Sequence, residues 1–132
     1  KIFGFTFFKL PQIQSLIKSS LEELNNHLCK LETELSSSKN KWLASDDFSL
    51  ADISWSVIIH RIDECGWGSL LLEKKPFVNA YYEKIKQRDS FIKGIVDQNN
   101  PNLRRGIKDL KLAIQSNSFL KSFHMELSKL NY

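Results

Sequence analysis

Residues 49–52, with the sequence Ser-Leu-Ala-Asp, constrain the fold of this chain more than any other segment. Their spacing is that of a capping box, in which the Ser49 hydroxyl accepts the backbone N–H of Asp52 and the Asp52 carboxylate accepts the N–H of Ser49. Phe48 and Ile53 flank the box at the positions of a hydrophobic staple. The segment therefore predicts a helix that begins at Ser49.

That helix is expected to be the buried centre of the fold. Its apolar residues cover most of the helical circumference, and such a helix is normally enclosed by others. They are Leu50, Ile53, Trp55, Val57, Ile58, Ile59, Ile62 and Cys65. Gly66 follows as a C-terminal stop, and Gly66 to Gly68 begins a connection.

Helical periodicity dominates the rest of the chain. Apolar residues recur at intervals of three and four from Ile13 to Leu35, and Pro76 stands at the expected first position of another helix. Shorter amphipathic patterns cover 89–96, 103–114 and 119–130. There is no convincing strand and no internal repeat. The sequence predicts an all-α helical bundle around the Ser49 helix.

Composition narrows the class of protein without identifying a function. The chain has 132 residues, of which 42% are hydrophobic and 26% charged, as expected of one ordinary globular domain. The net charge of +4 is spread along the chain, so nucleic acid is not an expected partner. One run of basic residues fits either a solvated helical surface or a patch for an anionic partner. It consists of Lys84, Lys86, Arg88, Lys93, Arg104, Arg105, Lys108 and Lys111. No apolar stretch approaches the roughly 20 residues of a membrane span.

The cysteines and histidines form no metal-binding pattern. Cys29 and Cys65 are far apart and have no nearby Cys or His cluster, so we expect both to be reduced and to serve as small buried hydrophobic residues in an intracellular chain. His60 and Arg61 are the most suggestive pair, since a histidine serves as a general base and an arginine binds an anion. No nucleophile or carboxylate is placed by the sequence to complete a constellation, which favours structural roles. We therefore predict no catalytic, cofactor or metal site within the chain.

Two segments resemble the C-terminal helical domain of glutathione transferases. Residues 42–53 resemble the family segment that starts its central helix, although Ser45 stands where the family usually has Gly. Residues 75–91 resemble the family's following helix and the step after it. The likeness covers about Ile13 to Val96. Within the superfamily the chain is most similar to the ganglioside-induced differentiation-associated protein group, on residues 30–35, 60–67 and 81–88.

This resemblance implies a domain over residues 1–98, truncated at its N-terminus, and a helical extension over 99–132. It implies that glutathione binding and the chemistry belong to a thioredoxin-like domain that the chain lacks, so that the isolated chain is inactive. His60, Arg61, Trp67 and Tyr82 are the candidates for the hydrophobic-substrate or interface side, with Trp67, beside two glycines, expected to be exposed.

The resemblance also implies a homodimer or a hetero-partner bound through the helical domain. A non-catalytic interaction module, of the kind found in translation-factor and tRNA-synthetase assemblies, is the alternative. The implied location is cytoplasmic, or the cytosolic face of the mitochondrial outer membrane.

Overall fold

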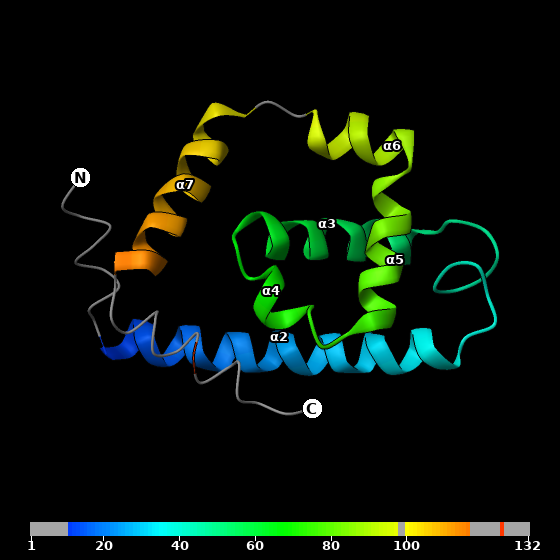
Figure 1. Cartoon of the computed structure of the whole chain (residues 1–132), viewed down its shortest axis with the longest axis horizontal. Coiled ribbons are helices and arrows are strands. Elements are labelled where there is room, and N and C mark those ends of the chain that lie inside the picture. The colour runs from blue at the N-terminus through cyan, green and yellow to red at the C-terminus, as the bar shows by residue number, and fades with distance from the viewer. Residues whose placement is uncertain (1–10, 98–99, 117–124, 126–132) are drawn as a thin grey trace.

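The computed structural model describes residues 11–97, 100–116 and 125, and helices dominate this part of the chain (Figure 1). No β-strand occurs among these residues, which confirms the predicted all-α class for them. The helix predicted over 119–130 lies, apart from residue 125, outside the described residues. Where the structure is described, no helix is both long and apolar enough to cross a membrane.

Helix α2 (Pro11–Ser37) runs along one side of the bundle, and α5 (Pro76–Lys86) packs against it (Figure 1). Its leucines at intervals of three and four turn to the same side, where Leu28 and Leu31 are buried. The amphipathic pattern of the sequence thus sets which face of α2 meets the core.

Helix α3 (Leu50–Glu64) starts directly after Ser49, and Ser49 and Asp52 form a capping box. One oxygen of the Asp52 carboxylate accepts the backbone N–H and the hydroxyl of Ser49, both at 2.8 Å. The other accepts the Tyr81 hydroxyl at 2.8 Å and the Leu43 N–H at 3.0 Å. Burial opposes ionisation of Asp52, but these hydrogen bonds outweigh it and hold its pKa below the usual value. This buried carboxylate joins the helix start, the preceding loop and α5.

Phe48 packs between Trp42 of the loop before α3 and Arg88, which follows α5. Its ring lies edge-on to Trp42, with centroids 4.8 Å apart, and the Arg88 guanidinium stacks 3.8 Å from its centroid. Ile53 is 47% exposed. The hydrophobic staple between Phe48 and Ile53 therefore stays a prediction. The ring contact that the structure shows for Phe48 is the edge-on contact with Trp42.

The expectation that α3 is enclosed on all sides is wrong for the described part of the chain. Ile59 and Ile62 are buried, but several large apolar residues of the same helix are exposed, namely Leu50, Ile53, Val57 and Ile58. The reason is that α3 packs against α4 (Gly68–Leu71) and α5, which cover only one side of it. A helix with apolar residues all round can be buried on every side, but the helices packed against it determine which of those residues are buried.

Helix α5 begins at Pro76, as predicted, and its start is capped by α2. The Glu32 carboxylate accepts the backbone N–H groups of Phe77 at 3.0 Å and Val78 at 2.8 Å. These are unpaired donors of the first turn, and a negative charge is favourable there. The hydrogen bonds link residues more than forty positions apart, so they fix α5 against α2.

The chain continues through α6 (Asp89–Phe91) and the π-helical segment η1 (Ile92–Val96) to α7 (Pro101–Ser116). The break predicted near residue 100 thus separates η1 from α7, and Pro101 is the first residue of the new helix. The division into a domain over 1–98 and an extension over 99–132 stays a prediction.

Candidate functional site

An apolar pocket of about 400 Å³ lies between α2, α3, α4 and α7. Its walls are almost entirely apolar, and among the lining residues Arg61 alone carries a charge at neutral pH. The lining consists of Leu21, Leu24, Val57, Ile58, Arg61, Ile62, Cys65, Trp67, Leu71 and Leu110. A pocket of this size and polarity falls in the range that binds small apolar molecules.

The turn after α3 explains how Trp67 reaches this pocket. Gly66 has a positive φ of 85°, which glycine adopts at little cost. The Gly66 N–H donates to the Asp63 carbonyl at 2.9 Å, and the Trp67 N–H donates to the Ile62 carbonyl at 3.0 Å. This pair of bonds is the Schellman motif, which folds the chain back over the helix it ends.

Trp67 was expected to be exposed because two glycines flank it, and this prediction is wrong. The indole is 8% exposed, and Trp67 and Ile62 both line the pocket. In a Schellman motif the residue after the left-handed glycine contacts the last turn of the helix. Gly66 therefore brings Trp67 inward rather than releasing it.

The pocket contains a thiol but no activated nucleophile. Burial raises the pKa of the Cys65 thiol, and Glu64 raises it further, while Arg61 and Lys111 oppose the shift. The thiol is therefore protonated at neutral pH, and only a thiolate is a strong nucleophile. Arg61 keeps 40% of its side chain exposed and pairs with Glu64 at 2.5 Å, which leaves other guanidinium donors for a ligand.

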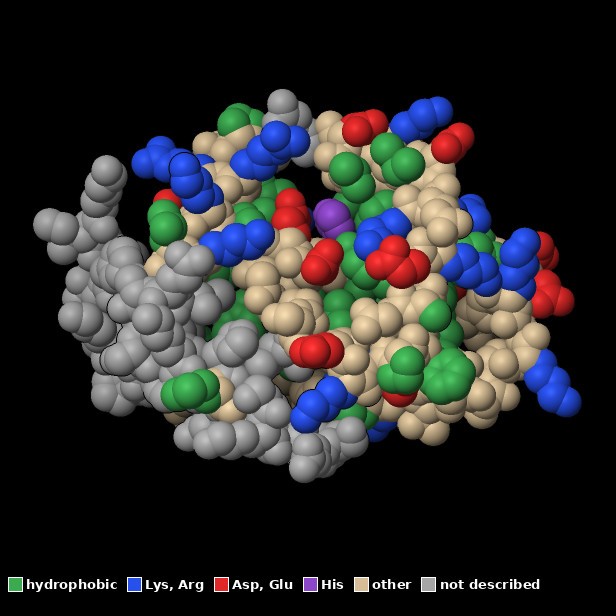
Figure 2. Space-filling view, in the orientation of Figure 1, with side chains coloured by type: hydrophobic (Ala, Val, Ile, Leu, Met, Phe, Trp, Pro, Cys, Tyr) green, Lys and Arg blue, Asp and Glu red, His purple; other side chains and the backbone are tan. Residues whose placement is uncertain are grey.

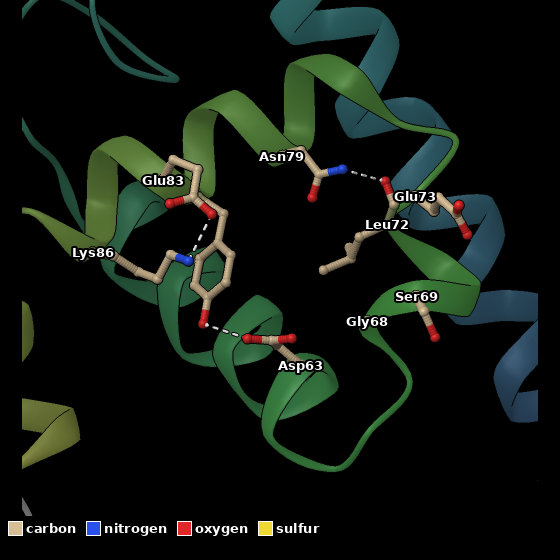
Figure 3. A pocket seen from close by; sticks show the side chains of 9 residues that line it. Asp63, Gly68, Ser69, Leu72, Glu73, Asn79, Glu83 and Lys86 are labelled. Carbon is tan, nitrogen blue, oxygen red and sulfur yellow. Dashed lines mark hydrogen bonds and ion pairs between the residues drawn. The ribbon is translucent and has the colours of Figure 1, made fainter.

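A smaller polar cleft, of about 220 Å³, lies beside the other wall of α4 (Figure 3). Leu71 of α4 lines the apolar pocket, whereas Gly68 and Ser69 of α4 line the cleft, together with Leu72, which follows the helix. The remaining lining residues are Asp63, Glu73, Asn79, Tyr82, Glu83 and Lys86. The cleft is acidic, because three of these residues are carboxylates and the one lysine, Lys86, is paired with Glu83 at 2.6 Å.

His60 and Tyr82 are joined by a hydrogen bond next to this cleft. His60 Nδ1 lies 2.8 Å from the Tyr82 hydroxyl. That hydroxyl also lies 3.4 Å from the Asp63 carboxylate, a contact marked by a dashed line in Figure 3. Burial, reinforced by Asp63, raises the pKa of Tyr82, so the phenol keeps its proton. The His60 ring also contacts Phe91 edge-on, with centroids 5.2 Å apart. These contacts tie α3 to α5 and α6.

The structure separates the four predicted site residues into two pairs. Arg61 and Trp67 line the apolar pocket, whereas Tyr82 lines the polar cleft and His60 is bonded to it. Sequence reasoning missed Leu24 and Leu110 as pocket residues. Both lie on the apolar faces of their helices, but the sequence gives no signal that these faces meet the same pocket.

Neither cavity suits a metal ion or glutathione. Within residues 11–97, 100–116 and 125, no cluster of three or more His, Cys, Asp or Glu residues is placed to hold a metal. Glutathione carries free carboxylates, which the acidic cleft would repel, and the apolar pocket offers Arg61 as its one cationic partner. The residues of these two cavities therefore do not form a glutathione-binding site.

The fold and the pocket define a class of small all-α domain that encloses an apolar site beside one capped helix. Residues 3–89 match the family described as "Glutathione S-transferase, C-terminal domain". Since the match covers more than half of the chain, this protein belongs to that family.

Relatives extend the comparison. The chain is 31% identical, over 74% of its length and 34% of the relative's, to "Tetrachloro-P-hydroquinone reductive dehalogenase" of Sphingobium chlorophenolicum. It is 32% identical, over 65% of its length and 24% of the relative's, to "2,5-dichlorohydroquinone reductive dechlorinase" of Sphingobium indicum. The matched chain thus spans a quarter to a third of these proteins. No solved structure matches the chain.

Proposed function

We propose that this chain is the helical part of a glutathione transferase-like protein and supplies its hydrophobic-substrate side through the apolar pocket. The observation that carries the proposal is the pocket of about 400 Å³ with apolar walls and Arg61 at one edge. Apolar walls bind the body of a ligand by the hydrophobic effect, and a guanidinium selects an anionic oxygen.

Chlorinated phenols and hydroquinones are the substrate class that we propose for this pocket. They combine a flat apolar ring with an acidic oxygen, which suits apolar walls with Arg61 at the edge. The names of the two relatives, a tetrachloro-p-hydroquinone dehalogenase and a 2,5-dichlorohydroquinone dechlorinase, support this choice. The ring would lie against Trp67 and Leu71, with its oxygen toward Arg61.

Calorimetric titration with tetrachlorohydroquinone under reducing conditions tests the pocket. Val57 lines it, whereas Val96 lies outside the lining in η1, and the two valines have similar exposures of 43% and 45%. We expect Val57→Trp to fill the pocket and weaken binding on the order of tenfold or more. Val96→Trp, the matched control, should bind like the parent chain. Equal affinities for both variants, or no binding by the parent chain, would overturn the assignment.

We further propose that the isolated chain does not conjugate glutathione. The raised pKa of the Cys65 thiol supports this, because a protonated thiol is neither a nucleophile nor a base. Turnover of glutathione with a small electrophile, followed spectrophotometrically, is the measurement. Turnover above the uncatalysed rate that Cys65→Ser or His60→Asn abolishes would contradict it.

A non-catalytic interaction module is the second candidate, and the exposed apolar side of α3 favours it. Leu50 is 79% exposed and Ile53 47%, and both precede the pocket residues Val57 and Ile58 along the helix. A face of this kind suits a partner helix or a second copy of the chain, as in a homodimer. Sedimentation analysis of the chain and of Ile53→Glu is the test. A monomer at all concentrations in both would count against the homodimer.

The subgroup, the domain boundary and the cellular location are further parts of the proposal. We propose kinship with the ganglioside-induced differentiation-associated protein group, with a domain boundary near residue 99 and a location in the cytoplasm or on the cytosolic face of the mitochondrial outer membrane. The supporting residues are those at 30–35, 60–67 and 81–88. Fractionation of cells that express the tagged chain tests the location.

A further inference from the structure

One glutamate of α3 joins the charged edge of the apolar pocket to a histidine outside it. The Oε2 atom of Glu64 lies 2.5 Å from the Arg61 guanidinium and 3.9 Å from His60 Nε2. Arg61 lines the apolar pocket, whereas His60 does not. Figure 2 shows acidic and basic side chains close together around a hollow with a histidine beside it. The charge of the His60 imidazole therefore acts on the same carboxylate oxygen that pairs with Arg61.

The His60 imidazole can gain a proton without losing a hydrogen bond. Because Nε2 faces the Glu64 carboxylate, the neutral ring keeps its proton on Nε2, and Nδ1 accepts the Tyr82 hydroxyl at 2.8 Å. When the ring is charged, Nδ1 donates to that hydroxyl oxygen, and the hydroxyl can donate to the Asp63 carboxylate, 3.4 Å away. Both forms are thus accommodated, and histidine is the side chain that ordinarily changes charge between about pH 5 and 8.

The groups that face His60 from the other helices leave its charge uncompensated. From α5 the ring meets Tyr82, whose phenol is neutral because burial raises its pKa. Lys86 lies 4.8 Å from the centre of that phenol ring, but Glu83 pairs with it at 2.6 Å. From α6 the ring meets Phe91, which carries no charge. Among the residues that the structure describes, the ion-pair partner of the imidazole is therefore the glutamate it shares with the pocket arginine.

We propose that His60 is a positioning residue that sets the preference of the apolar pocket for anions, because its protonation strengthens anion binding beside Arg61. The inference rests on the proposed function of this pocket. With a neutral His60, the charges of Arg61 and Glu64 cancel at the pocket edge. A charged imidazole makes the group of three net positive and attracts Glu64 away from the guanidinium, whose donors then serve the ligand. Anions should bind more tightly in weak acid than in weak base, while uncharged ligands should respond little.

Two fluorescent dyes with the same rings test the proposal. The sulfonate of anilinonaphthalene sulfonate stays ionised across the range in which histidine titrates, and phenylnaphthylamine lacks that charge. We expect the sulfonate to bind on the order of fivefold more tightly at about pH 5.5 than at about pH 8, the lower end of the coupling found between two sites. The uncharged amine should bind equally at both. Near-ultraviolet circular dichroism at each pH checks that the chain stays folded.

Three variants locate the effect. His60→Asn keeps a polar group toward the phenol but does not titrate, so the pH response should vanish. His27→Asn is the matched control, because His27 also lies 3.9 Å from a glutamate four residues away, Glu23, but does not line the apolar pocket. This control should respond to pH like the parent chain. Glu64→Gln frees Arg61 and should bind the sulfonate severalfold more tightly than the parent chain at about pH 8.

The outcomes separate this proposal from the assignment of the pocket. A pH response that survives in His60→Asn, or that the uncharged amine shares, would overturn the role of His60. Sulfonate binding that does not depend on pH but is weakened by Val57→Trp would refute the role of His60 and leave the pocket in place. Binding that Val57→Trp does not change would refute the pocket and the role of His60 together.

Discussion

Replacing Asp52 with alanine should destabilise the fold more than any other single change to an exposed or buried carboxylate in the described residues. The side chain is fully buried and accepts hydrogen bonds from Ser49, Leu43 and Tyr81. Loss of the cap costs about 1 kcal/mol. The Leu43 N–H and the Tyr81 hydroxyl would each lose a buried partner, at about 1–3 kcal/mol apiece.

Together these effects amount to about 3–7 kcal/mol, a large share of the roughly 5–15 kcal/mol that keeps a domain folded. For a chain of this length we expect the melting temperature in thermal circular dichroism to fall on the order of 10 °C or more. Asp47→Ala is the matched control, because Asp47 is exposed and its carboxylate makes no hydrogen bond that the structure describes. That variant should change stability by less than about 0.5 kcal/mol.

The pH dependence of Asp52 provides a separate check. Its pKa in the folded chain lies below the ordinary value of 3.8, so ionised Asp52 stabilises the fold fully above that pH. The contribution is lost as the pH falls through the folded-state pKa. Asp52→Asn should therefore lower stability at neutral pH and flatten its decline in acid. An Asp52→Ala melting temperature equal to that of Asp47→Ala would refute the capping-box reasoning.

Three further predictions concern single contacts, each measured by urea denaturation. Tyr82→Phe removes the hydrogen bond to His60 and should cost about 1 kcal/mol, with little change if the bond is not formed in solution. Gly68→Ala should cost less than about 1 kcal/mol, because its Cβ would stand 2.6 Å from the exposed Asp63 carboxylate, which can turn away at the loss of its long contact with the Tyr82 hydroxyl, whereas Gly94→Ala has nothing within 4 Å and should not destabilise. Glu32→Gln keeps the size of the side chain but loses its charge at the start of α5. A cost of about 0.5–1 kcal/mol is expected, and an unchanged midpoint would argue against the cap.

Local signals in the sequence were sufficient for most of the helices. The start of α3 at Ser49, the first position of Pro76 in α5 and the stop at Gly66 all appear in the structure. Each depends on contacts within a few residues, namely a cap, a fixed φ or a left-handed glycine. Such contacts are the same whatever surrounds the helix, so they can be read before the fold is known.

The site depended on contacts between distant segments, and there sequence reasoning was incomplete. His60, Arg61, Trp67 and Tyr82 were singled out together, yet the structure assigns Arg61 and Trp67 to one cavity and Tyr82 to another. The separation follows from α4, which stands between the cavities, and the sequence carries no sign of where a four-residue helix packs.

The sequence by itself thus determined the helical class, the capped start of α3 and the turn that follows it. Only the tertiary structure decided which residues share a cavity, how much of α3 is covered and that Glu32 caps α5 from across the bundle. The physical reason is range: hydrogen bonds within a turn are fixed by spacing along the chain, whereas packing depends on which helix faces meet, and many pairs of amphipathic faces are chemically alike.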